Sequence, residues 1–226
     1  MNNANAAMIR LEQISKVFRA GAVETAALDK VDLRIAKGEF VAVMGPSGCG
    51  KSTLLNILGL LDGPTSGRYF LGDREVAGYS ERQRTALRKG TIGFIFQSFN
   101  LIDELTVYEN VELPLLYLGA GPRERLRRVE GVLERLGMQH RRNHFPQQLS
   151  GGQQQRVAIS RALVTDPSVI LADEPTGNLD SANGREVMEL LRKMKSTGAT
   201  IVMVTHAEQD AAQADRIIRL FDGRLA

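Results

Sequence analysis

The sequence predicts an α/β fold with a mainly parallel central sheet. At least six short apolar runs are typical of strands, and helical patterns separate them along the chain. One of these runs, residues 40–44, leads straight into a glycine-rich loop that opens a helical pattern, with apolar residues at Leu54, Leu55, Leu58 and Leu61. With 226 residues, 43% of them hydrophobic, the chain is long enough for one large domain or two small ones.

The glycine-rich loop, residues 45–52, has the pattern Gly-x-x-x-x-Gly-Lys-Ser. Its glycines let backbone N–H groups close around a phosphate chain, which then rests on the positive N-terminus of the following helix. There Lys51 reaches the β- and γ-phosphates and Ser52 ligates Mg²⁺. A glycine-rich turn without a ligand is the alternative. We expect a nucleoside triphosphate to contact Gly45, Pro46, Ser47, Gly48, Cys49, Gly50, Lys51, Ser52 and Thr53.

The composition argues against several classes of protein. A net charge of +3 is too mild to indicate nucleic acid, so no nucleic-acid partner is expected. No apolar run approaches the roughly 18 residues of a membrane span. Residues 1–7 lack the charged and apolar regions of a secretory signal. The single cysteine excludes an internal disulfide and fits a reducing cytosol.

The chain is expected to form a single domain over residues 1–226, made of a core and an insertion. Residues 8–97 and 163–226 form the nucleotide-binding core, in which residues 8–35 hold two strand patterns. Residues 98–162 form a mainly helical subdomain. Within it, residues 123–142 are rich in arginine and carry an apolar stripe at helical spacing, formed by Leu126, Val129, Leu133 and Leu136. This pattern fits a solvated basic helix or proximity to an anionic membrane surface.

A second anion-facing loop lies at residues 149–156, Leu-Ser-Gly-Gly-Gln-Gln-Gln-Arg. Ser150 is a good N-cap, two glycines free the backbone, and residues 153–164 have a helical pattern. A capped helix that binds nothing is the alternative. The string resembles the signature motif of the ATP-binding-cassette (ABC) ATPases. That resemblance implies a P-loop NTPase fold with N-terminal antiparallel strands, ATP and Mg²⁺ as ligands, and a homodimer on ATP binding. In it, one subunit covers its partner's nucleotide with Ser150, Gly151, Gly152 and Gln153.

Further strings stand in the order that this family has. Asp173 and Glu174 end a buried strand, where the first carboxylate suits Mg²⁺ and the second suits polarising the attacking water. A solvated strand end is the alternative. The resemblance implies that Gln97 touches Mg²⁺ or the water, that Asp180 faces the opposite subunit, and that His206 is the switch histidine. The implied catalytic set is Lys51, Gln97, Glu174 and His206.

An aromatic side chain that stacks on adenine is a further feature of the family. The matching residue is Phe18, which precedes the second N-terminal strand and offers a π surface without a hydroxyl. A core aromatic on a strand is the alternative.

The resemblance covers nearly the whole chain, and within the family it is greatest to the lipoprotein-releasing and macrolide-export type. Residues 61–67, 96–101 and 105–111 carry this likeness. It implies an ATP-hydrolysing subunit at the cytoplasmic face of the inner membrane, bound peripherally to integral-membrane permease subunits. We expect a separate permease, with an excised domain as the alternative. An ATP-gated scaffold without transport, as in the cell-division member of the family, would have the same site. A P-loop ATPase acting on DNA is excluded, since residues 98–148 lack its long coiled coil.

Two further features of the sequence each allow two interpretations. Cys49, beside a helix N-terminus and Lys51, is either a reactive thiol protected by MgATP or a small filler residue. Five large apolar residues after Gln97 either fill the core of the helical subdomain or form a docking groove for the permease, and they are Phe99, Leu101, Ile102, Leu105 and Tyr108.

Overall fold

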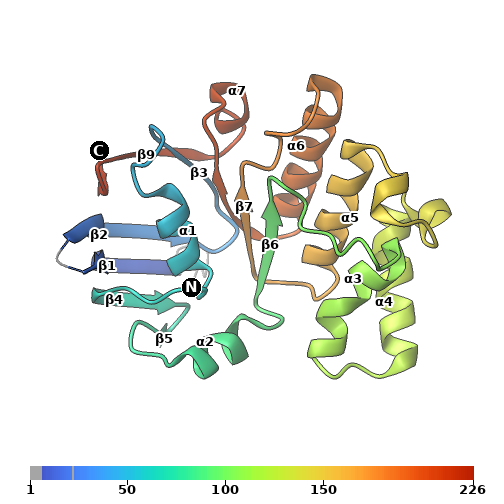
Figure 1. Cartoon of the computed structure of the whole chain (residues 1–226), viewed down its shortest axis with the longest axis horizontal. Coiled ribbons are helices and arrows are strands. Elements are labelled where there is room, and N and C mark those ends of the chain that lie inside the picture. The colour runs from blue at the N-terminus through green and yellow to red at the C-terminus, as the bar shows by residue number, and fades with distance from the viewer. Residues whose placement is uncertain (1–6, 22) are drawn as a thin grey trace, which may run out of the picture. The chain divides into compact units, whose positions relative to one another are not determined.

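A computed structural model describes residues 7–21 and 23–226 and divides the chain into two compact units (Figure 1). The first unit is Met1–Arg88 together with Met194–Ala226, and the second is Lys89–Lys193. The second unit therefore contains the expected helical subdomain and also strands and a helix that flank it. Among the described residues, no helix is both long and apolar enough to cross a lipid bilayer.

The first unit contains parallel strands that lead into the phosphate loop. Strand β3 (Phe40–Met44) pairs in parallel with β8 (Thr200–Val204) and with β9 (Arg216–Phe221), and β9 turns back into β10 (Arg224–Leu225). All five residues of β3 and all five of β8 are buried, which explains their unbroken apolar sequences. Helix α1 (Lys51–Leu58) follows the loop, and α7 (Glu208–Ala211) follows β8.

The same unit holds an antiparallel sheet in the order β2-β1-β4-β5. Its strands are β1 (Ala7–Ala20), β2 (Val23–Ala36), β4 (Ser66–Leu71) and β5 (Arg74–Glu75), and α2 (Glu81–Arg88) follows them. Strands β1 and β2 confirm the two expected N-terminal strands. Their pairing runs from Ala7 opposite Ala36 to Ala20 opposite Val23.

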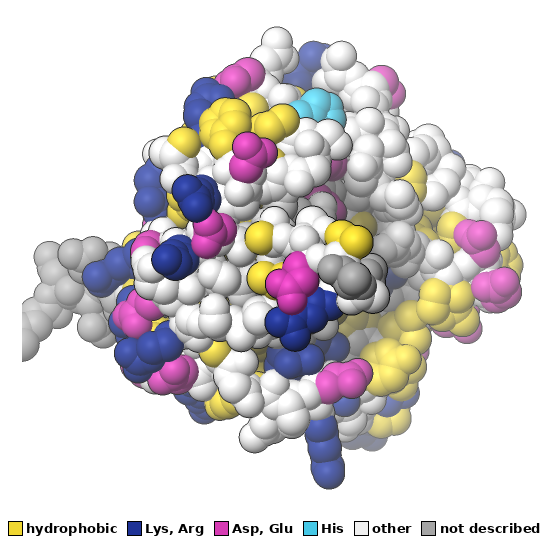
Figure 2. Space-filling model, turned by 60° about the vertical axis from the view of Figure 1, so that its left-hand side comes forward, with side chains coloured by type: hydrophobic (Ala, Val, Ile, Leu, Met, Phe, Trp, Pro, Cys, Tyr) yellow, Lys and Arg dark blue, Asp and Glu magenta, His cyan; other side chains and the backbone are white. Residues whose placement is uncertain are grey.

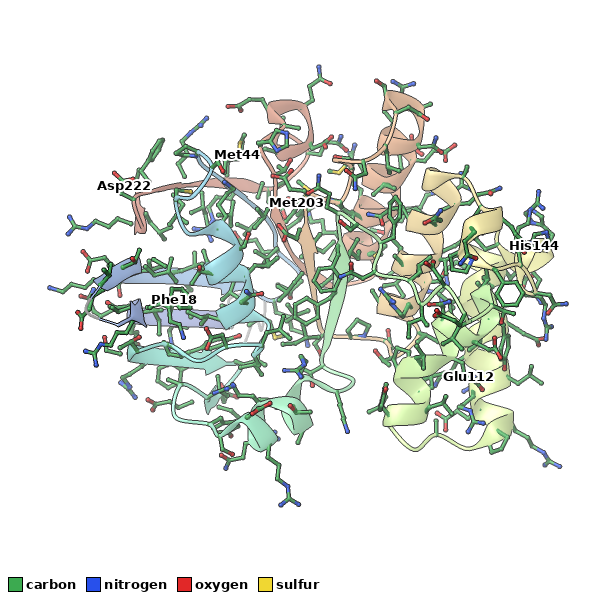
Figure 3. All side chains as sticks on the ribbon, in the orientation of Figure 1. Phe18, Met44, Glu112, His144, Met203 and Asp222 are labelled. Atoms are coloured by element: carbon green, nitrogen blue, oxygen red, sulfur yellow. The ribbon has the colours of Figure 1, made fainter. Side chains whose placement is uncertain are left out.

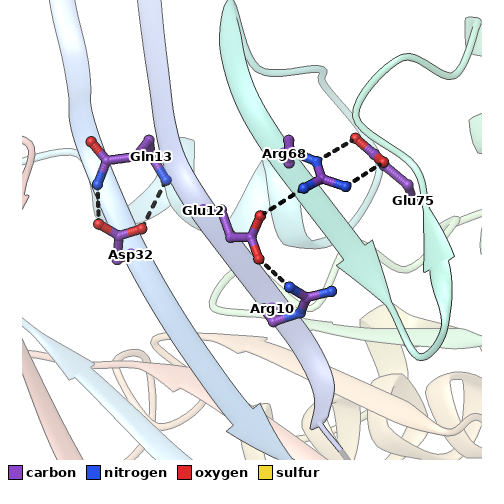
Figure 4. Close-up of polar contacts among 6 residues, drawn as sticks. All are labelled: Arg10, Glu12, Gln13, Asp32, Arg68 and Glu75. Atoms are coloured by element: carbon purple, nitrogen blue, oxygen red, sulfur yellow. Dashed lines mark hydrogen bonds and ion pairs between the residues drawn. The ribbon is translucent and has the colours of Figure 1, made fainter.

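A bulge in β1 aligns this sheet with its core. Leu11 and Ile14 are three positions apart and both are buried, which regular alternation does not allow. Gln13 takes up the extra residue with a φ of 51°, and its N–H donates to the Asp32 carboxylate at 2.9 Å (Figure 4). The bulge therefore returns Ile14 to the buried face.

Ion pairs cover the exposed face of the antiparallel sheet (Figure 4). Arg68 binds Glu75 through two bonds of 3.1 Å each and lies 3.3 Å from Glu12, which also pairs with Arg10. On the face drawn in Figure 2, basic and acidic side chains are likewise interspersed. Exposed pairs of this kind contribute little to stability individually.

The second unit joins two parallel strands to a group of helices. Strand β6 (Ile92–Phe96) pairs with β7 (Val169–Asp173). The helices are α3 (Val107–Tyr117), α4 (Pro122–Arg135), α5 (Gly151–Leu163) and α6 (Ser181–Ser196), with short 3₁₀ turns at Gln139–Arg141 and Pro146–Gln148. α3, α4 and α5 pack against one another (Figure 1).

In helix α4, one residue of the expected apolar stripe is not buried. Val129, Leu133 and Leu136 are buried, but Leu126 is 43% exposed and Val132 takes the place in the core. The buried face thus follows the i, i+3, i+4, i+7 spacing that starts at Val129 rather than at Leu126.

The arginines of this segment are partly neutralised. Arg125 pairs with Glu112 at 2.7 Å, and Glu124 pairs with Arg128 at 2.8 Å. Arg142 pairs with Glu130 at 2.7 Å. These ion pairs favour the solvated basic helix over a membrane-binding surface.

Helix α1 is shorter than the sequence pattern predicts, because Leu61 was expected on its apolar face. The helix ends at Leu58, Leu60 adopts a φ of 56°, and Leu61 is 43% exposed. Fully buried Tyr69 donates its hydroxyl hydrogen to the carbonyl of Leu58 at 2.7 Å. A tertiary hydrogen bond thus satisfies the last turn of the helix.

Replacing Tyr69 by Phe should lower the free energy of unfolding by about 1–2 kcal/mol, because the buried Leu58 carbonyl loses its donor. Urea unfolding measures this change. Tyr117→Phe is the matched control, since that side chain is 70% exposed, and it should change stability by less than about 0.5 kcal/mol. Equal stability of the two variants would contradict the assignment.

Candidate functional site

The phosphate loop joins β3 to α1 within the first unit. Gly50 is the N-cap of α1 with φ 105°, no side chain caps the helix, and its first turn has no acidic residue. The positive end of the helix dipole is therefore not neutralised by a local carboxylate, as an anion site requires. Ser52 lies exposed in the first turn of α1, and Thr53 beside it is half-buried.

Close backbone contacts fix the loop on both sides. A Cβ atom at Gly45 would lie 2.1 Å from the carbonyl oxygen of Leu220, and one at Gly50 would lie 2.3 Å from that of Ala27. Real Cβ atoms do not approach backbone oxygens so closely. Glycine is therefore required at both positions by the packing of β9 and β2 as well as by any ligand.

Lys51 is already directed over the loop. Its Nζ donates to the carbonyl oxygens of Gly45 and Pro46, both at 2.8 Å, and lies 3.9 Å from Cys49 Sγ. The ammonium group thus stands over the segment that would surround a phosphate. Cys49 is only 3% exposed and its carbonyl accepts from Gly223 N–H at 3.0 Å. This burial favours the filler role over a reactive thiol.

His206 lies at the same sheet edge as the loop. Val43 pairs with Val204 in the parallel β3–β8 ladder, so the residues that follow both strands lie at the same end of the sheet. Thr205 is buried and donates its N–H to the Val43 carbonyl at 3.2 Å, and His206 next to it is exposed. Within the first unit, the fold therefore brings the expected switch histidine to the edge that carries Lys51.

Phe18 projects from β1 with 47% of its surface exposed, which excludes a core role. Figure 3 labels it on the antiparallel sheet and labels Met44 at the end of β3, where the loop begins. Val17 pairs with Ala26 in the neighbouring strand, next to the Ala27 carbonyl that abuts Gly50. The aromatic side chain is thus carried by the hairpin that packs on the phosphate loop.

The carboxylates and Gln97 lie at one edge of the second unit. Phe96 is opposite Asp173 in the parallel β6–β7 pair, so Gln97 and Glu174 follow neighbouring strand ends. β7 ends at Asp173, and Glu174, expected to be its last residue, lies outside the strand with a φ of 46°. This left-handed conformation is uncommon for a glutamate and is typical of functional sites.

Asn178 holds Gln97 through a reciprocal pair of hydrogen bonds. Asn178 Nδ2 donates to the Gln97 carbonyl at 3.0 Å, and Gln97 Nε2 donates to Asn178 Oδ1 at 3.2 Å. A Cβ at Gly177 would lie 2.8 Å from Gln97 Nε2, so this glycine admits the amide. Asn178 lies two residues before Asp180, which was expected to face the opposite subunit, and nothing in the sequence predicted this bond.

The signature residues cap and pack α5. Ser150 caps the helix by accepting from Gln153 N–H at 3.4 Å, and its own N–H donates to Gln153 Oε1 at 3.1 Å. α5 begins at Gly151, two residues before the predicted start. A Cβ at Gly152 would lie 2.0 Å from Asn183 Oδ1, so this glycine serves the contact with α6.

Asp180 caps the next helix. Its carboxylate accepts from the N–H groups of Ala182 and Asn183, both at 2.9 Å, and from Asn183 Nδ2 at 2.6 Å. The hydrogen bonds from Asn183 hold the pKa of Asp180 below its ordinary value. Within this chain the residue is therefore engaged in fixing the start of α6.

Arg161 is a partly buried charge that was not among the predicted site residues. Its guanidinium donates to the carbonyl oxygens of Asn100 at 2.5 Å and Phe99 at 2.8 Å, and burial lowers its pKa. Phe99 and Asn100 have φ values of 60° and 50°, which are unfavourable for residues other than glycine. The fork of Arg161 thus holds a strained turn two residues after Gln97. An arginine within the apolar sequence of residues 157–163 was the available signal.

Asn110 is a second polar residue whose role was not predicted from the sequence. It is fully buried in α3, where its Nδ2 donates to the Ile102, Leu105 and Thr106 carbonyls at 2.9–3.0 Å. Its Oδ1 accepts from Ile102 N–H at 2.8 Å. One amide therefore holds the loop between Gln97 and α3.

The family described as ABC transporter matches residues 28–177. The chain belongs to the ABC transporter family. It has the α/β, P-loop NTPase fold of the family's ATP-binding cassettes, and it is an ATPase of the ABC type.

Similar proteins differ in length. A macrolide export ATP-binding/permease protein of Rhodospirillum rubrum is 51% identical over 218 residues, which are 96% of this chain and 34% of that protein. An uncharacterized ABC transporter ATP-binding protein of Methanocaldococcus jannaschii is 50% identical over 96% of this chain and 97% of that protein. The chain thus spans about a third of the macrolide-export relatives.

Solved structures match over nearly the full chain. A dimeric ATP-binding cassette in a post-hydrolysis state, bound to ADP and Pi, superposes with a TM-score of 0.89 at 45% identity, covering 96% of both chains. A second dimeric cassette of a bacterial ABC transporter gives 0.89 at 47% identity.

Replacing Arg161 by Lys should loosen the turn after Gln97, because a single ammonium cannot donate to both carbonyls in the geometry of a guanidinium fork. We expect faster amide hydrogen exchange at Phe99 and Asn100 and a loss of about 2 kcal/mol in unfolding free energy. Arg127→Lys, on the exposed surface of α4, is the control. Unchanged exchange at the two amides in Arg161→Lys would rule out the proposed role.

Proposed function

We propose that this ABC ATPase binds MgATP, closes as an ATP-sandwiched homodimer and powers an integral-membrane permease. The observation that carries the proposal is the pair of helix N-termini prepared for anions. α1 follows a complete phosphate loop with Lys51 directed over it, whereas α5 is capped by Ser150 and begins with two glycines, no acidic residue in its first turn and no lysine. One chain therefore offers one full site and one half-site, which two chains can complete for each other.

In the full site, the phosphate loop and Lys51 hold the phosphates and Phe18 stacks on the base. Ser52, Asp173 and the Gln97 side chain supply the oxygens for Mg²⁺. Bound Mg²⁺ would neutralise phosphate charge. In the described residues, no group of three or more His, Cys, Asp or Glu side chains is arranged for a metal. Mg²⁺ is usually held by one or two carboxylates together with substrate phosphates and water.

Glu174 serves as the general base for the attacking water, and His206 contacts the γ-phosphate. Two observations support the role of Glu174. Glu174 stands directly after the Asp173 strand end in a strained conformation, and Gln97 at the neighbouring strand end is fixed by Asn178. With its amide nitrogen bound to Asn178, Gln97 can direct its amide oxygen to Mg²⁺ or the water.

The partner subunit supplies the second half of each site. Ser150, Gly151, Gly152 and Gln153 close over the nucleotide of the opposite chain, and Asp180 orders the adjoining segment by capping α6. The two dimeric cassettes described above support such a state for this chain. ATP then favours the dimer by mass action, and its hydrolysis weakens the contact.

The membrane partner is an integral-membrane permease, and the ATPase lies peripherally at the cytoplasmic face of the inner membrane. The relative from Rhodospirillum rubrum is named as both ATP-binding and permease protein, and this chain matches a third of it. Lipoprotein release and the export of a drug, such as a macrolide, or of a peptide are the transport classes that the sequence favours. Identification of the membrane protein that co-purifies with the chain tests this assignment.

Replacing Glu174 by Gln keeps the shape of the side chain but removes the charge that polarises water. ATP hydrolysis should fall by roughly two to four orders of magnitude, while ATP binding persists. The dimer should then survive in ATP and not in ADP, as measured by light scattering. Glu134→Gln, at an exposed position of α4, is the control and should hydrolyse ATP normally. A monomeric Glu174→Gln with ATP demonstrably bound would falsify the sandwich for the isolated chain.

The docking surface for the permease is the segment after Gln97. Leu101 is half-buried and Ile102 is 42% exposed, and Asn110 and Arg161 fix the backbone on either side of them. A rigid turn with exposed apolar side chains suits a helix of a membrane partner.

Ile102→Glu and Leu101→Glu should therefore abolish co-purification with the permease and leave ATP binding intact. Phe145→Glu changes an equally exposed apolar residue outside this segment, with 41% exposure, and should have no effect. Retention of the permease by both segment variants would remove the assignment.

A further inference from the structure

Lys16 lies beside Phe18, the proposed platform on which the base stacks, and other contacts hold Lys16 in place. Its Nζ forms an ion pair with Asp62 at 2.7 Å and donates to the carbonyl of Gly63 at 2.9 Å, and only 13% of its side chain is exposed. The same ammonium lies over the ring of Phe18, 5.0 Å from the ring centroid. This distance is within the range of a cation–π interaction.

The loop that holds Lys16 continues directly from the phosphate-loop helix. α1 ends at Leu58, and the chain then reaches Asp62 and Thr65 within one short turn. Thr65 Oγ1 accepts from Val17 N–H at 3.0 Å, and Thr65 N–H donates to Ser15 at 2.8 Å. β1 is therefore attached to this loop on both sides of Lys16.

The contacts of the Asp62 carboxylate favour its ionised form. Burial alone would raise its pKa, but hydrogen bonds from Lys16 and from the Gly63 N–H outweigh burial and hold the pKa below its ordinary value. Arg84 adds a further positive charge nearby. Asp62 thus remains an anion near neutral pH and keeps Lys16 in position.

We propose that Lys16 is a positioning residue for the base of the bound nucleotide, acting through the ring of Phe18. This inference rests on the proposed stacking of Phe18 on adenine. Its ammonium orients the ring by covering one face, while the 47% exposure of Phe18 leaves an open surface for a base. Asp62, at the end of the loop that follows α1, sets the position of the platform relative to the phosphate loop.

Lys16 does not act on the phosphates. The Asp62 carboxylate balances its charge, and the Gly63 carbonyl accepts a hydrogen bond from its ammonium group. A lysine that binds phosphate needs its donors for the anion, as Lys51 can provide once the loop carbonyls release it. Loss of Lys16 should therefore weaken binding of the base and leave binding of a bare triphosphate chain unchanged.

The test is calorimetric titration of the full chain with MgATP, MgGTP and magnesium tripolyphosphate. Lys16→Met should weaken ATP and GTP binding alike, by roughly three- to tenfold, because stacking reads the face of a base and not its edge. Tripolyphosphate affinity should stay unchanged. Lys16→Arg keeps the cation and should restore nucleotide binding.

Two further variants separate positioning from folding. In a Phe18→Leu background, Lys16→Met should cause no additional loss, since the ring through which it acts is absent. Asp62→Asn retains the lysine and should reproduce the selective loss more weakly, which keeps the inference testable if Lys16→Met does not fold. Lys37→Met, an exposed lysine in the turn between β2 and β3, is the matched control.

Equal weakening of all three ligands, or no weakening of ATP by Lys16→Met and Asp62→Asn, would overturn the inference. So would a wild-type chain that binds tripolyphosphate as tightly as ATP, because the base would then contribute nothing. A wild-type chain that binds neither ligand would instead refute the proposed function itself.

Discussion

The first unit depends on the close approach of backbone to backbone around the phosphate loop. Gly50 lies against the Ala27 carbonyl, Gly45 lies against the Leu220 carbonyl, and the Gly223 N–H donates to Cys49 at 3.0 Å. β2 and the β9–β10 turn thus enclose a loop that has no side-chain cap of its own. The polar groups of the loop can then face a ligand because neighbouring strands, not the loop's own side chains, determine its shape.

In the second unit, side-chain contacts hold three short segments near one sheet edge. Asn178 ties Gln97 to the string before α6, Arg161 ties α5 to the turn at Phe99 and Asn100, and Gly152 lets α5 approach α6. Left-handed conformations at Glu174, Phe99 and Asn100 persist because these contacts determine them. A membrane partner that displaced this turn would therefore also displace Gln97 and the signature helix α5. Such a displacement is a physical route by which the partner and the ATPase site of an ABC ATPase could be coupled.

The sequence could predict the elements and the identity of the motifs, because these depend on local patterns. An unbroken apolar run predicted β3, and Ser150 with Gln153 predicted the capped start of α5. It could not predict that Leu61 leaves α1 or that Leu126 is exposed, since tertiary contacts decide where a helix ends and which face is buried. The roles of Arg161, Asn110 and Lys16 also escaped it, because each side chain meets partners that no periodicity reports.

We infer that the packing of the loop against the Ala27 carbonyl shapes the proposed phosphate site. The most direct measurement is the ATP affinity of Gly50→Ala compared with Gly72→Ala. Both glycines have positive φ values, 105° and 58°, but only Gly50 faces a backbone atom, whereas a Cβ at Gly72 meets nothing within 4 Å. We expect folded Gly50→Ala to lose ATP affinity by more than about tenfold, while Gly72→Ala binds ATP as the parent does. Parental ATP affinity in Gly50→Ala would show that this packing is not needed for phosphate binding.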